Sequence, residues 1–306
     1  MTARMYAFES WAELGAFAER APLDRAIVRF ETAVDAMVGG DRDMLEALLR
    51  EDPSLVGARS ARRHRATLLH YIAANGVEGW RQRTPPNAVE IARLLLDAGA
   101  DPNALADMYD ARCTTLSMLV SSSHPADAGL QRPLAELLVD RGATLEAPGS
   151  PWNAAVLTAL AFGYLDTARA LAAREGRVRD IAVAAGLGLL GETARLLPTA
   201  DAERQRAALT LACMHGQLRV AQLLLDAGVD PSQYSPDGFH AHSTPLHQAV
   251  WSNREPVVRL LVERGARHDM RDLVYDGTPL DWAEHGQRTE IADYLRGRNP
   301  PRATAP

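Results

Sequence analysis

Residues 243–267 read STPLHQAVWSNREPVVRLLVERGAR, and this stretch decides the fold. The hydroxyl of Thr244 can cap a helix that begins at Pro245, because proline is tolerated in the first turn of a helix. Leucine, valine and alanine then recur at helical spacing in two runs, with the polar turn 252–254 between them. Gly265 ends the second run, where a left-handed residue is favoured. The stretch therefore predicts two short helices joined by a turn.

The same pattern returns along the whole chain. A second clear copy, ALTLACMHGQLRVAQLLLDAGVDP, occupies 208–231, and the tetrapeptide TPLD at 278–281 starts a further unit. Degraded starts stand at 67–70 and 114–117. Helix endings related to LLLDAGADP lie at 94–102, 137–143, 223–231 and 260–266. Weaker units fill the gaps at 30–53, 154–176 and 181–197.

These motifs resemble the ankyrin repeat, whose TPLH signature stands at 244–247. The resemblance covers most of 30–296 in about eight repeats, some of them degenerate, and implies an all-α solenoid of stacked helix-turn-helix units with short β-hairpin-like finger loops. Each unit buries only half its surface alone, so stacking must complete the core. We expect an N-terminal helical cap over 1–24, a repeat domain over 25–298 and a disordered tail over 299–306.

Three loops depart from the pattern. Insertions near 76–86 (GVEGWRQRTPP) and 121–131 (SSSHPADAGLQ) separate the two helices of their units, and the connection 230–244 is longer than a usual finger. Loops on a rigid scaffold are favoured binding elements. We therefore expect both insertions and the tip of the long finger to contribute to binding.

Composition narrows the function classes. The net charge of −6 comes from interspersed acidic and basic residues, so no basic field exists to attract nucleic acid. The chain has no lysine, which excludes Schiff-base and phosphate-loop lysine chemistry. This arginine- and alanine-rich composition favours a GC-rich, bacterial coding genome. Two cysteines are too few for a disulfide scaffold, and no apolar stretch is long enough to span a membrane, so we expect a cytoplasmic protein.

Three local patterns suggest other chemistry. Residues 186–191 match GxGxxG, the turn of a dinucleotide site, but the flanking repeats leave no room for the strands that such a site requires. His240 and His242 form an HxH pair that could hold a metal in a metal-responsive module, although exposed contact residues are the default in a finger. The basic cluster at 59–65 is interpreted as a solvated finger loop. We therefore expect no cofactor and no metal.

In the ankyrin family, the finger tips and the exposed side of the first helix of each pair form a concave recognition surface. Carried onto this chain, that resemblance implies partner contacts from Trp80, Tyr109, Phe239, His240, His242, Ser243, Trp251, Leu273 and Tyr275. No serine-histidine-acid set or paired-carboxylate motif is visible. We expect a non-catalytic scaffold, monomeric, that binds a protein partner and neither nucleic acid nor membrane.

Overall fold

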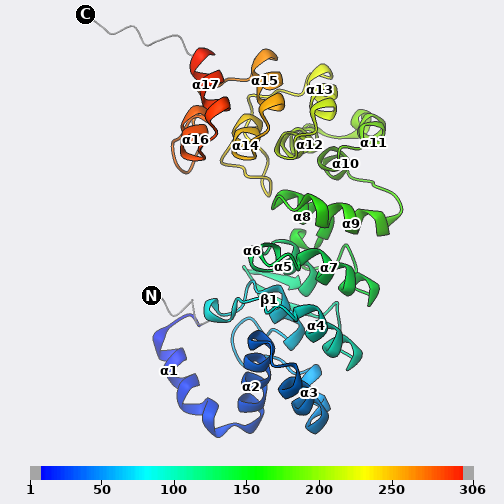
Figure 1. Cartoon of the computed structure of the whole chain (residues 1–306), viewed down its shortest axis with the longest axis vertical. Coiled ribbons are helices and arrows are strands. Elements are labelled where there is room, and N and C mark those ends of the chain that lie inside the picture. Colours follow the sequence, from blue (N-terminus) through cyan, green and yellow to red (C-terminus); the bar gives the residue numbers. More distant parts are fainter. Residues whose placement is uncertain (1–7, 299–306) are drawn as a thin grey trace, which may run out of the picture. The chain divides into compact units, whose positions relative to one another are not determined.

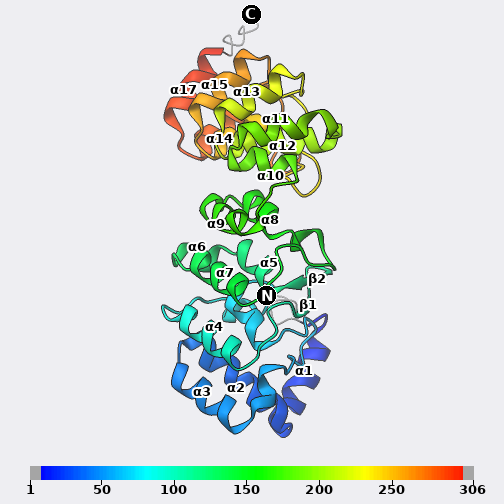
Figure 2. The same ribbon diagram turned by 90° about the vertical axis from the view of Figure 1, so that its right-hand side faces the viewer.

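A computed structural model describes residues 8–298 of the chain. The disordered tail predicted for 299–306, and the first seven positions of the predicted N-terminal cap, lie outside the described residues. The chain divides into two compact units, Met1–Glu175 (unit 1) and Gly176–Pro306 (unit 2). Each unit consists of paired helices laid side by side (Figures 1 and 2).

Unit 1 opens with α1 (Trp11–Arg20) and the 3-10 turn η2 (Ala21–Leu23). Four helix pairs follow in the described residues: α2 (Arg25–Gly39) with α3 (Arg42–Glu51), η4 (Leu68–Ala73) with α4 (Ala88–Asp97), α5 (Thr115–Val120) with α7 (Gln131–Asp140), and α8 (Ala155–Ala161) with α9 (Leu165–Glu175). First helices contact first helices, and second helices contact second helices, so the pairs form two rows. The insertions near 76–86 and 121–131 contain η5 (Gly79–Arg81) and α6 (Ser123–Asp127).

Unit 2 repeats this arrangement. Its pairs among the described residues are α10 (Ile181–Leu187) with α11 (Leu190–Leu196), α12 (Ala202–Met214) with α13 (Leu218–Asp226), α14 (Pro245–Trp251) with α15 (Glu255–Glu263), and α16 (Pro279–His285) with α17 (Thr289–Arg298). Further 3-10 turns in the described part of the chain are η3 (Pro53–Val56) and η6 (Pro151–Asn153) in unit 1 and η7 (Leu197–Thr199) in unit 2. The predicted all-α fold of stacked helix-turn-helix units is confirmed.

The core of unit 2 runs through all its pairs, because small residues let the first helices approach one another. Fully buried alanines line these helices at Ala185, Ala208, Ala212, Ala249 and Ala283. Leucines of the second helices fill the space behind them. Each pair therefore completes the core of its neighbours, as a stacked repeat requires.

The threonine caps form as predicted. Thr244 caps α14 through a reciprocal pair of hydrogen bonds with His247, and its backbone N–H donates to Nδ1 of that histidine. Since Nδ1 is an acceptor, Nε2 carries the proton and donates to the carbonyl of Gly277 at 3.1 Å. Burial lowers the pKa of His247, which keeps the ring neutral. The histidine of TPLH thus links the start of α14 to the next finger.

One finger of unit 1 is a two-stranded antiparallel hairpin of β1 (Leu105–Met108) and β2 (Ala111–Thr114). Its turn, Tyr109 and Asp110, has positive φ at both residues, as a tight two-residue hairpin turn requires. The backbone N–H of Asp107 also donates to the carbonyl of His64 at 2.8 Å, which ties this finger to the preceding one. The predicted hairpin-like finger is therefore confirmed here. Between residues 8 and 298, no helix is both long and apolar enough to cross a membrane.

Candidate protein-recognition surfaces

A cluster of rings lies where two fingers of unit 2 meet the helices α14 and α16. We call it the aromatic surface, and its members are His240, His242, Trp251, Tyr275, Trp282 and His285. The ring of Trp282 lies at its centre, with ring centroids 5.9 Å from Trp251 and 6.0 Å from His242. His242 contacts the ring of Tyr275 at 6.4 Å, and His285 stacks on Trp251 at 6.3 Å. Four predicted contact residues from separate parts of the sequence therefore share one surface.

The finger beside this surface presents three consecutive apolar side chains to solvent. Leu273 is 67% exposed, Val274 62% and Tyr275 76%, and Trp251 on α14 is 48% exposed. We call residues 273–275 the apolar tip. Large exposed apolar side chains that lie together often mark interaction sites, whereas single scattered ones are common on any protein surface. Leu273 and Tyr275 are predicted contacts, and Val274 between them is likewise exposed although no repeat motif marks it.

Asp272 holds the apolar tip in place. Its buried carboxylate accepts hydrogen bonds from the backbone N–H groups of Val274, Tyr275 and Gly277 at 2.7–2.9 Å, and from the indole of Trp282 at 2.9 Å. Burial alone would raise the pKa of this carboxyl, but the hydrogen bonds outweigh burial and hold the pKa at about 2. The carboxylate stays ionised at neutral pH, so the tip is fixed before any partner arrives.

The long finger, residues 230–244, exposes fewer of its predicted contact residues than expected. Ser243 is fully buried. Its hydroxyl donates to the carbonyl of His240 at 3.0 Å and accepts from Gln248 at 2.8 Å. The prediction that Ser243 is a contact residue is wrong, because its buried side chain holds the base of the finger and cannot reach a partner. Phe239, His240 and His242 are partly exposed. The protruding part of this finger therefore lies before Ser243.

The histidine pair does not extend to a metal centre. His240 and His242 have ring centroids 6.1 Å apart. Over the described range 8–298, no three histidine, cysteine, aspartate or glutamate side chains are placed to hold a metal ion. The nearby His247 is already bound through both ring nitrogens to Thr244 and Gly277.

The GxGxxG segment is a turn between two helices. Residues up to Leu187 belong to α10, Gly188 caps that helix with φ of 80°, and α11 begins at Leu190. The side-chain amide of Gln217 donates to the carbonyl of Gly186 at 3.1 Å. A dinucleotide-binding turn requires a strand where this chain has α10. Gly188 instead allows close approach of the Gln217 side chain from the next helix pair.

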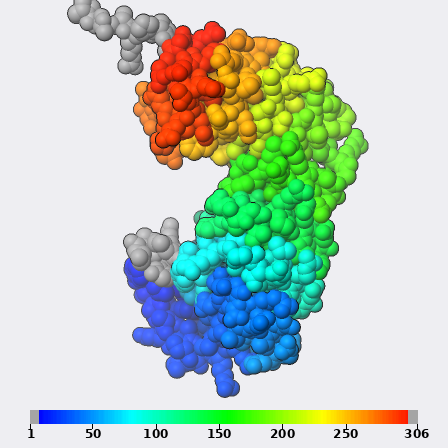
Figure 3. All heavy atoms as spheres, in the orientation of Figure 1, coloured from blue at the N-terminus to red at the C-terminus, as the bar shows by residue number. Residues whose placement is uncertain are grey.

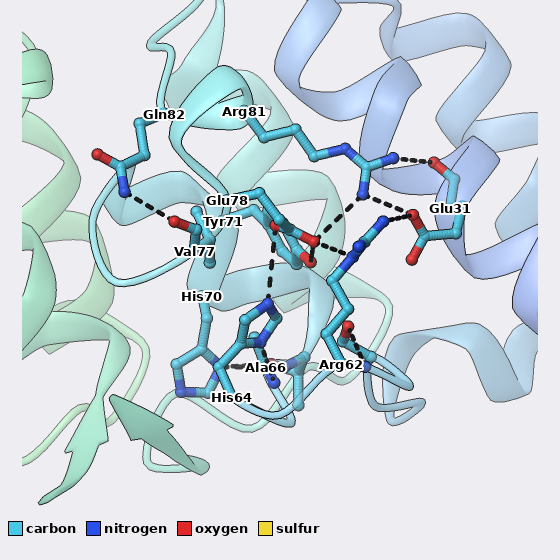
Figure 4. A network of polar contacts seen from close by, with 12 residues as sticks. Glu31, Arg62, His64, Ala66, His70, Tyr71, Val77, Glu78, Arg81 and Gln82 are labelled. Carbon is cyan, nitrogen blue, oxygen red and sulfur yellow. Dashed lines mark hydrogen bonds and ion pairs between the residues drawn. The ribbon is translucent and has the colours of Figure 1, made fainter. Parts of the chain in front are cut away.

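Unit 1 contains a buried network of charges where the basic cluster was expected to be solvated (Figure 4). Arg62 and His64 are buried, and Arg62 forms ion pairs with Glu31 at 2.8 Å and with Glu78. Arg81 pairs with Glu31 at 2.7 Å and Glu78 at 3.5 Å. The solvated interpretation is wrong for Arg62 and His64, because the insertion brings Glu78 and Arg81 onto the finger.

Glu78 is the hub of this network. It accepts a hydrogen bond from the hydroxyl of Tyr71 at 3.2 Å and lies 3.7 Å from Nε2 of His64. Burial would raise its pKa, but His64 and the positive charge of Arg62 hold the pKa below its usual value. The charge of Glu78 therefore compensates two arginines in a water-poor site, and the network fixes the 76–86 insertion.

The two remaining predicted contacts lie in unit 1. Trp80 belongs to the 76–86 insertion and is partly exposed, with the guanidinium of Arg62 5.5 Å from its ring. Tyr109 stands at the hairpin turn, 65% exposed, and its hydroxyl donates to Asn75 at 2.5 Å. An open hollow of about 570 Å³ lies beside it, lined by Phe8, Glu9, Arg63, His64, Gly76, Val77, Gly79, Gln82, Asp107, Met108, Tyr109 and Asp110.

Comparison with known proteins identifies the family of this repeat architecture. A family model described as ankyrin repeats, in three copies, matches residues 129–272, and a single ankyrin repeat model matches 64–107. The human cyclin-dependent kinase 4 inhibitor B is 32% identical over 126 residues, which cover 40% of this chain and 88% of that protein. The bovine protein of the same name is 35% identical over 83 residues, 27% of this chain and 60% of its own length. The chain belongs to the ankyrin repeat family.

Proposed function

We propose that this protein is a non-catalytic scaffold that recognises a protein partner through the aromatic surface and the apolar tip of unit 2. One observation carries the proposal: Leu273, Val274 and Tyr275 are three consecutive exposed residues, and the ring of Tyr275 belongs to the same chain of ring contacts, through His242 and Trp282, as the exposed ring of Trp251. Tyrosine and tryptophan dominate the binding energy of protein interfaces, because they bury large areas at a low cost in side-chain entropy.

The rigidity of the tip supports the same proposal. The four hydrogen bonds on Asp272 and the hydrogen bond from the Leu273 N–H to the His242 carbonyl at 2.8 Å fix the tip in the unbound protein. A surface that is ordered before binding loses less conformational entropy when the complex forms. We therefore expect tight binding from a small number of contacts.

Exposed residues select the partner, because the buried residues of the repeats pack the helix pairs against one another. The human relative is named as an inhibitor of a cyclin-dependent kinase, and its match extends over 40% of this chain. For this chain we propose a protein partner, and we propose that the aromatic surface determines which proteins are bound. We also propose a monomer without nucleic-acid binding, in line with the net charge of −6, and a cytoplasmic location, in line with two free, buried cysteines.

Affinity capture with matched variants tests the proposal. Wild-type protein and the double variant Trp251→Ala/Tyr275→Ala are used to capture proteins from the native cell, with quantification by mass spectrometry. The control is Leu218→Ala, which removes an apolar side chain that is 40% exposed on α13, a second helix of the same unit. We expect one protein to be captured by wild type and control but reduced at least about tenfold with the double variant, because hot-spot residues each contribute about 2 kcal/mol or more. Equal capture by all three would reject the aromatic surface.

A further inference from the structure

The insertion at 76–86 is attached to unit 1 mainly through charged side chains. All residues of this segment are described, and Val77 is the only apolar side chain among them that is buried, whereas Glu78 and Arg81 are both buried. Residues 81–83 donate their backbone hydrogen bonds to carbonyls within the segment itself. A segment with so little buried apolar surface gains little from the hydrophobic effect. Its attachment to the repeats therefore depends on ion pairs.

These ion pairs connect the insertion to two other parts of unit 1. Arg81 pairs with Glu31 and with Asp35, both on α2, at 2.7 Å each. Glu78 pairs with Arg62, which belongs to the preceding finger. Figure 4 shows the guanidinium groups of Arg62 and Arg81 meeting at Glu31 and Glu78. One network of charges thus holds the insertion, the finger and α2 together.

Buried ion pairs make a cooperative latch. The total free energy that they contribute is small, because the cost of desolvating each charge offsets most of the attraction. When one partner leaves, however, the other remains as a buried charge without compensation, which is strongly unfavourable. The pairs of this network are therefore expected to separate together, with the freed charges becoming solvated, rather than one at a time.

Both ends of the insertion are fixed to the helix pairs by asparagine side chains. Before it, the side chain of Asn75 donates to the carbonyl of Met118 at 3.3 Å and to the hydroxyl of Ser121 at 3.0 Å. After it, the side chain of Asn87 donates to the carbonyl of Gly40 at 2.9 Å. Separation of the ion pairs therefore frees the residues between these two anchors and leaves the anchors in place.

We propose that residues 76–86 are a flap that opens as one unit while the helix pairs of unit 1 stay stacked, and that the ion pairs of Glu78 and Arg81 are its latch. Segments with few buried apolar contacts open at a lower free energy than the core of a protein. This proposal concerns unit 1 alone and does not rest on the function proposed for the aromatic surface.

Opening of the flap changes the surface that unit 1 presents. Four residues of the flap line the open hollow of about 570 Å³ beside Tyr109, so the open form lacks one wall of this hollow. Figure 3 shows the cyan atoms of this part of the chain at the surface of unit 1, between the blue atoms of α2 and α3 and the green atoms that follow. The predicted contact Trp80 moves with the flap. Recognition by unit 1 is therefore gated by the state of the latch.

Thiol labelling of the full-length protein measures the opening. Val77→Cys places a thiol at a buried position of the flap, and the native Cys113 and Cys213 are fully buried in units 1 and 2. We expect a maleimide to modify position 77 while the native cysteines stay unmodified, because the flap opens without unfolding of the repeats. Mass spectrometry of proteolytic fragments identifies which cysteine has reacted.

Removal of the latch should accelerate this labelling. Adding Arg81→Met keeps a long apolar side chain but removes the ion pairs, so we expect the labelling rate at position 77 to rise at least about tenfold. The matched control Arg83→Met changes an exposed arginine of the same segment and should leave the rate unchanged. Hydrogen exchange in α2, α4 and α5 should stay at the wild-type rate in both variants.

Hydrogen exchange provides a measure that needs no added cysteine. In Arg81→Met alone, exchange of residues 81–83 should rise at least about tenfold. The proposal is overturned if position 77 is not labelled, if it reacts no faster than the native cysteines, or if Arg81→Met and Arg83→Met have equal effects. It is also overturned if Arg81→Met raises exchange in α2 and α4 as much as in the flap, since the insertion would then be an integral part of the stack. The capture experiment on unit 2 is unaffected by any of these outcomes.

Discussion

The indole of Trp282 donates a hydrogen bond to the carboxylate of Asp272 at 2.9 Å, and this bond ties helix α16 to the finger that precedes it. The same carboxylate holds the backbone of the apolar tip. The ring at the centre of the aromatic surface and the exposed tip are therefore positioned by one buried group. Any change at Asp272 should affect stability and recognition together.

Replacing Asp272 by alanine should destabilise unit 2 by roughly 1–3 kcal/mol, because it leaves buried donors without acceptors. Hydrogen exchange in the helices of unit 2 at increasing urea concentrations measures this. The control Asp237→Ala removes an exposed carboxylate of the same unit and should change the free energy of unfolding by less than about 0.5 kcal/mol. Equal effects of the two substitutions would show that Asp272 does not organise the tip.

Stability should fall with acid because of His70. Burial lowers the pKa of His70 to about 4, below the value near 6.5 of an unfolded histidine. The unfolded chain therefore takes up a proton first as the pH falls, so the stabilisation present above about pH 6.5 is lost progressively between pH 6.5 and pH 4. The loss from this group is at most about 2 kcal/mol between pH 6.5 and pH 5.

Thermal denaturation followed by circular dichroism at pH 7 and pH 5 measures this dependence. His70→Gln cannot take up the proton, so its melting temperature should fall less between the two pH values than that of wild type. His285→Gln changes an exposed histidine and should keep the pH dependence of wild type. An unchanged dependence in His70→Gln would exclude His70 as its source.

Glu78→Gln should destabilise unit 1 strongly. The substitution removes the buried charge that compensates Arg62 and Arg81, and breaking a buried ion pair from one side costs about 3–5 kcal/mol. Glu46→Gln, which removes a carboxylate from pairs on the surface of α3, should cost less than about 1 kcal/mol. Chemical denaturation of both variants provides the comparison, and a Glu78→Gln variant as stable as Glu46→Gln would contradict the network.

The GxGxxG turn offers a matched pair of glycines. A Cβ added to Gly188 would clash with the side-chain oxygen of Gln217, in a backbone conformation with φ of +80°, whereas a Cβ on Gly191 in α11 meets no atom within 4 Å. We expect Gly188→Ala to lower the melting temperature in calorimetry, by an amount equivalent to about 1 kcal/mol or more. Gly191→Ala should be neutral or stabilising, because alanine favours helices. The reverse order would exclude a structural role for the turn.

The repeated parts of the fold could be predicted from the sequence, because each helix pair carries its own local signals. Thr244 and Pro245 mark the start of a helix through local interactions alone, and Gly265 marks the end of one. Once the pairs stack in register, finger residues such as His242 and Tyr275 fall on the same face. The grouping of four predicted contacts in unit 2 follows from this regularity.

The unpredicted features depend on contacts outside the repeat pattern. Glu78 and Arg62 lie outside the repeat motifs, and their ion pair exists because the insertion folds back onto the finger. Composition around 59–65 indicates solvation, since it shows the arginines without their distant carboxylates. The burial of Ser243 likewise depends on the path of the long finger, and the bonds made by Asp272 depend on the path of the finger that follows it. No local signal in the sequence marks these residues.

The most direct test of the central claim is photocrosslinking in the native cell with benzoylphenylalanine placed at position 275. The aromatic replacement preserves the exposed ring of Tyr275 and reacts only with a protein that contacts the tip. We predict one discrete crosslinked protein at position 275 and none at position 218 on α13, the opposite row of the same unit. The absence of an adduct at 275, or the same adducts at both positions, would contradict recognition through the aromatic surface.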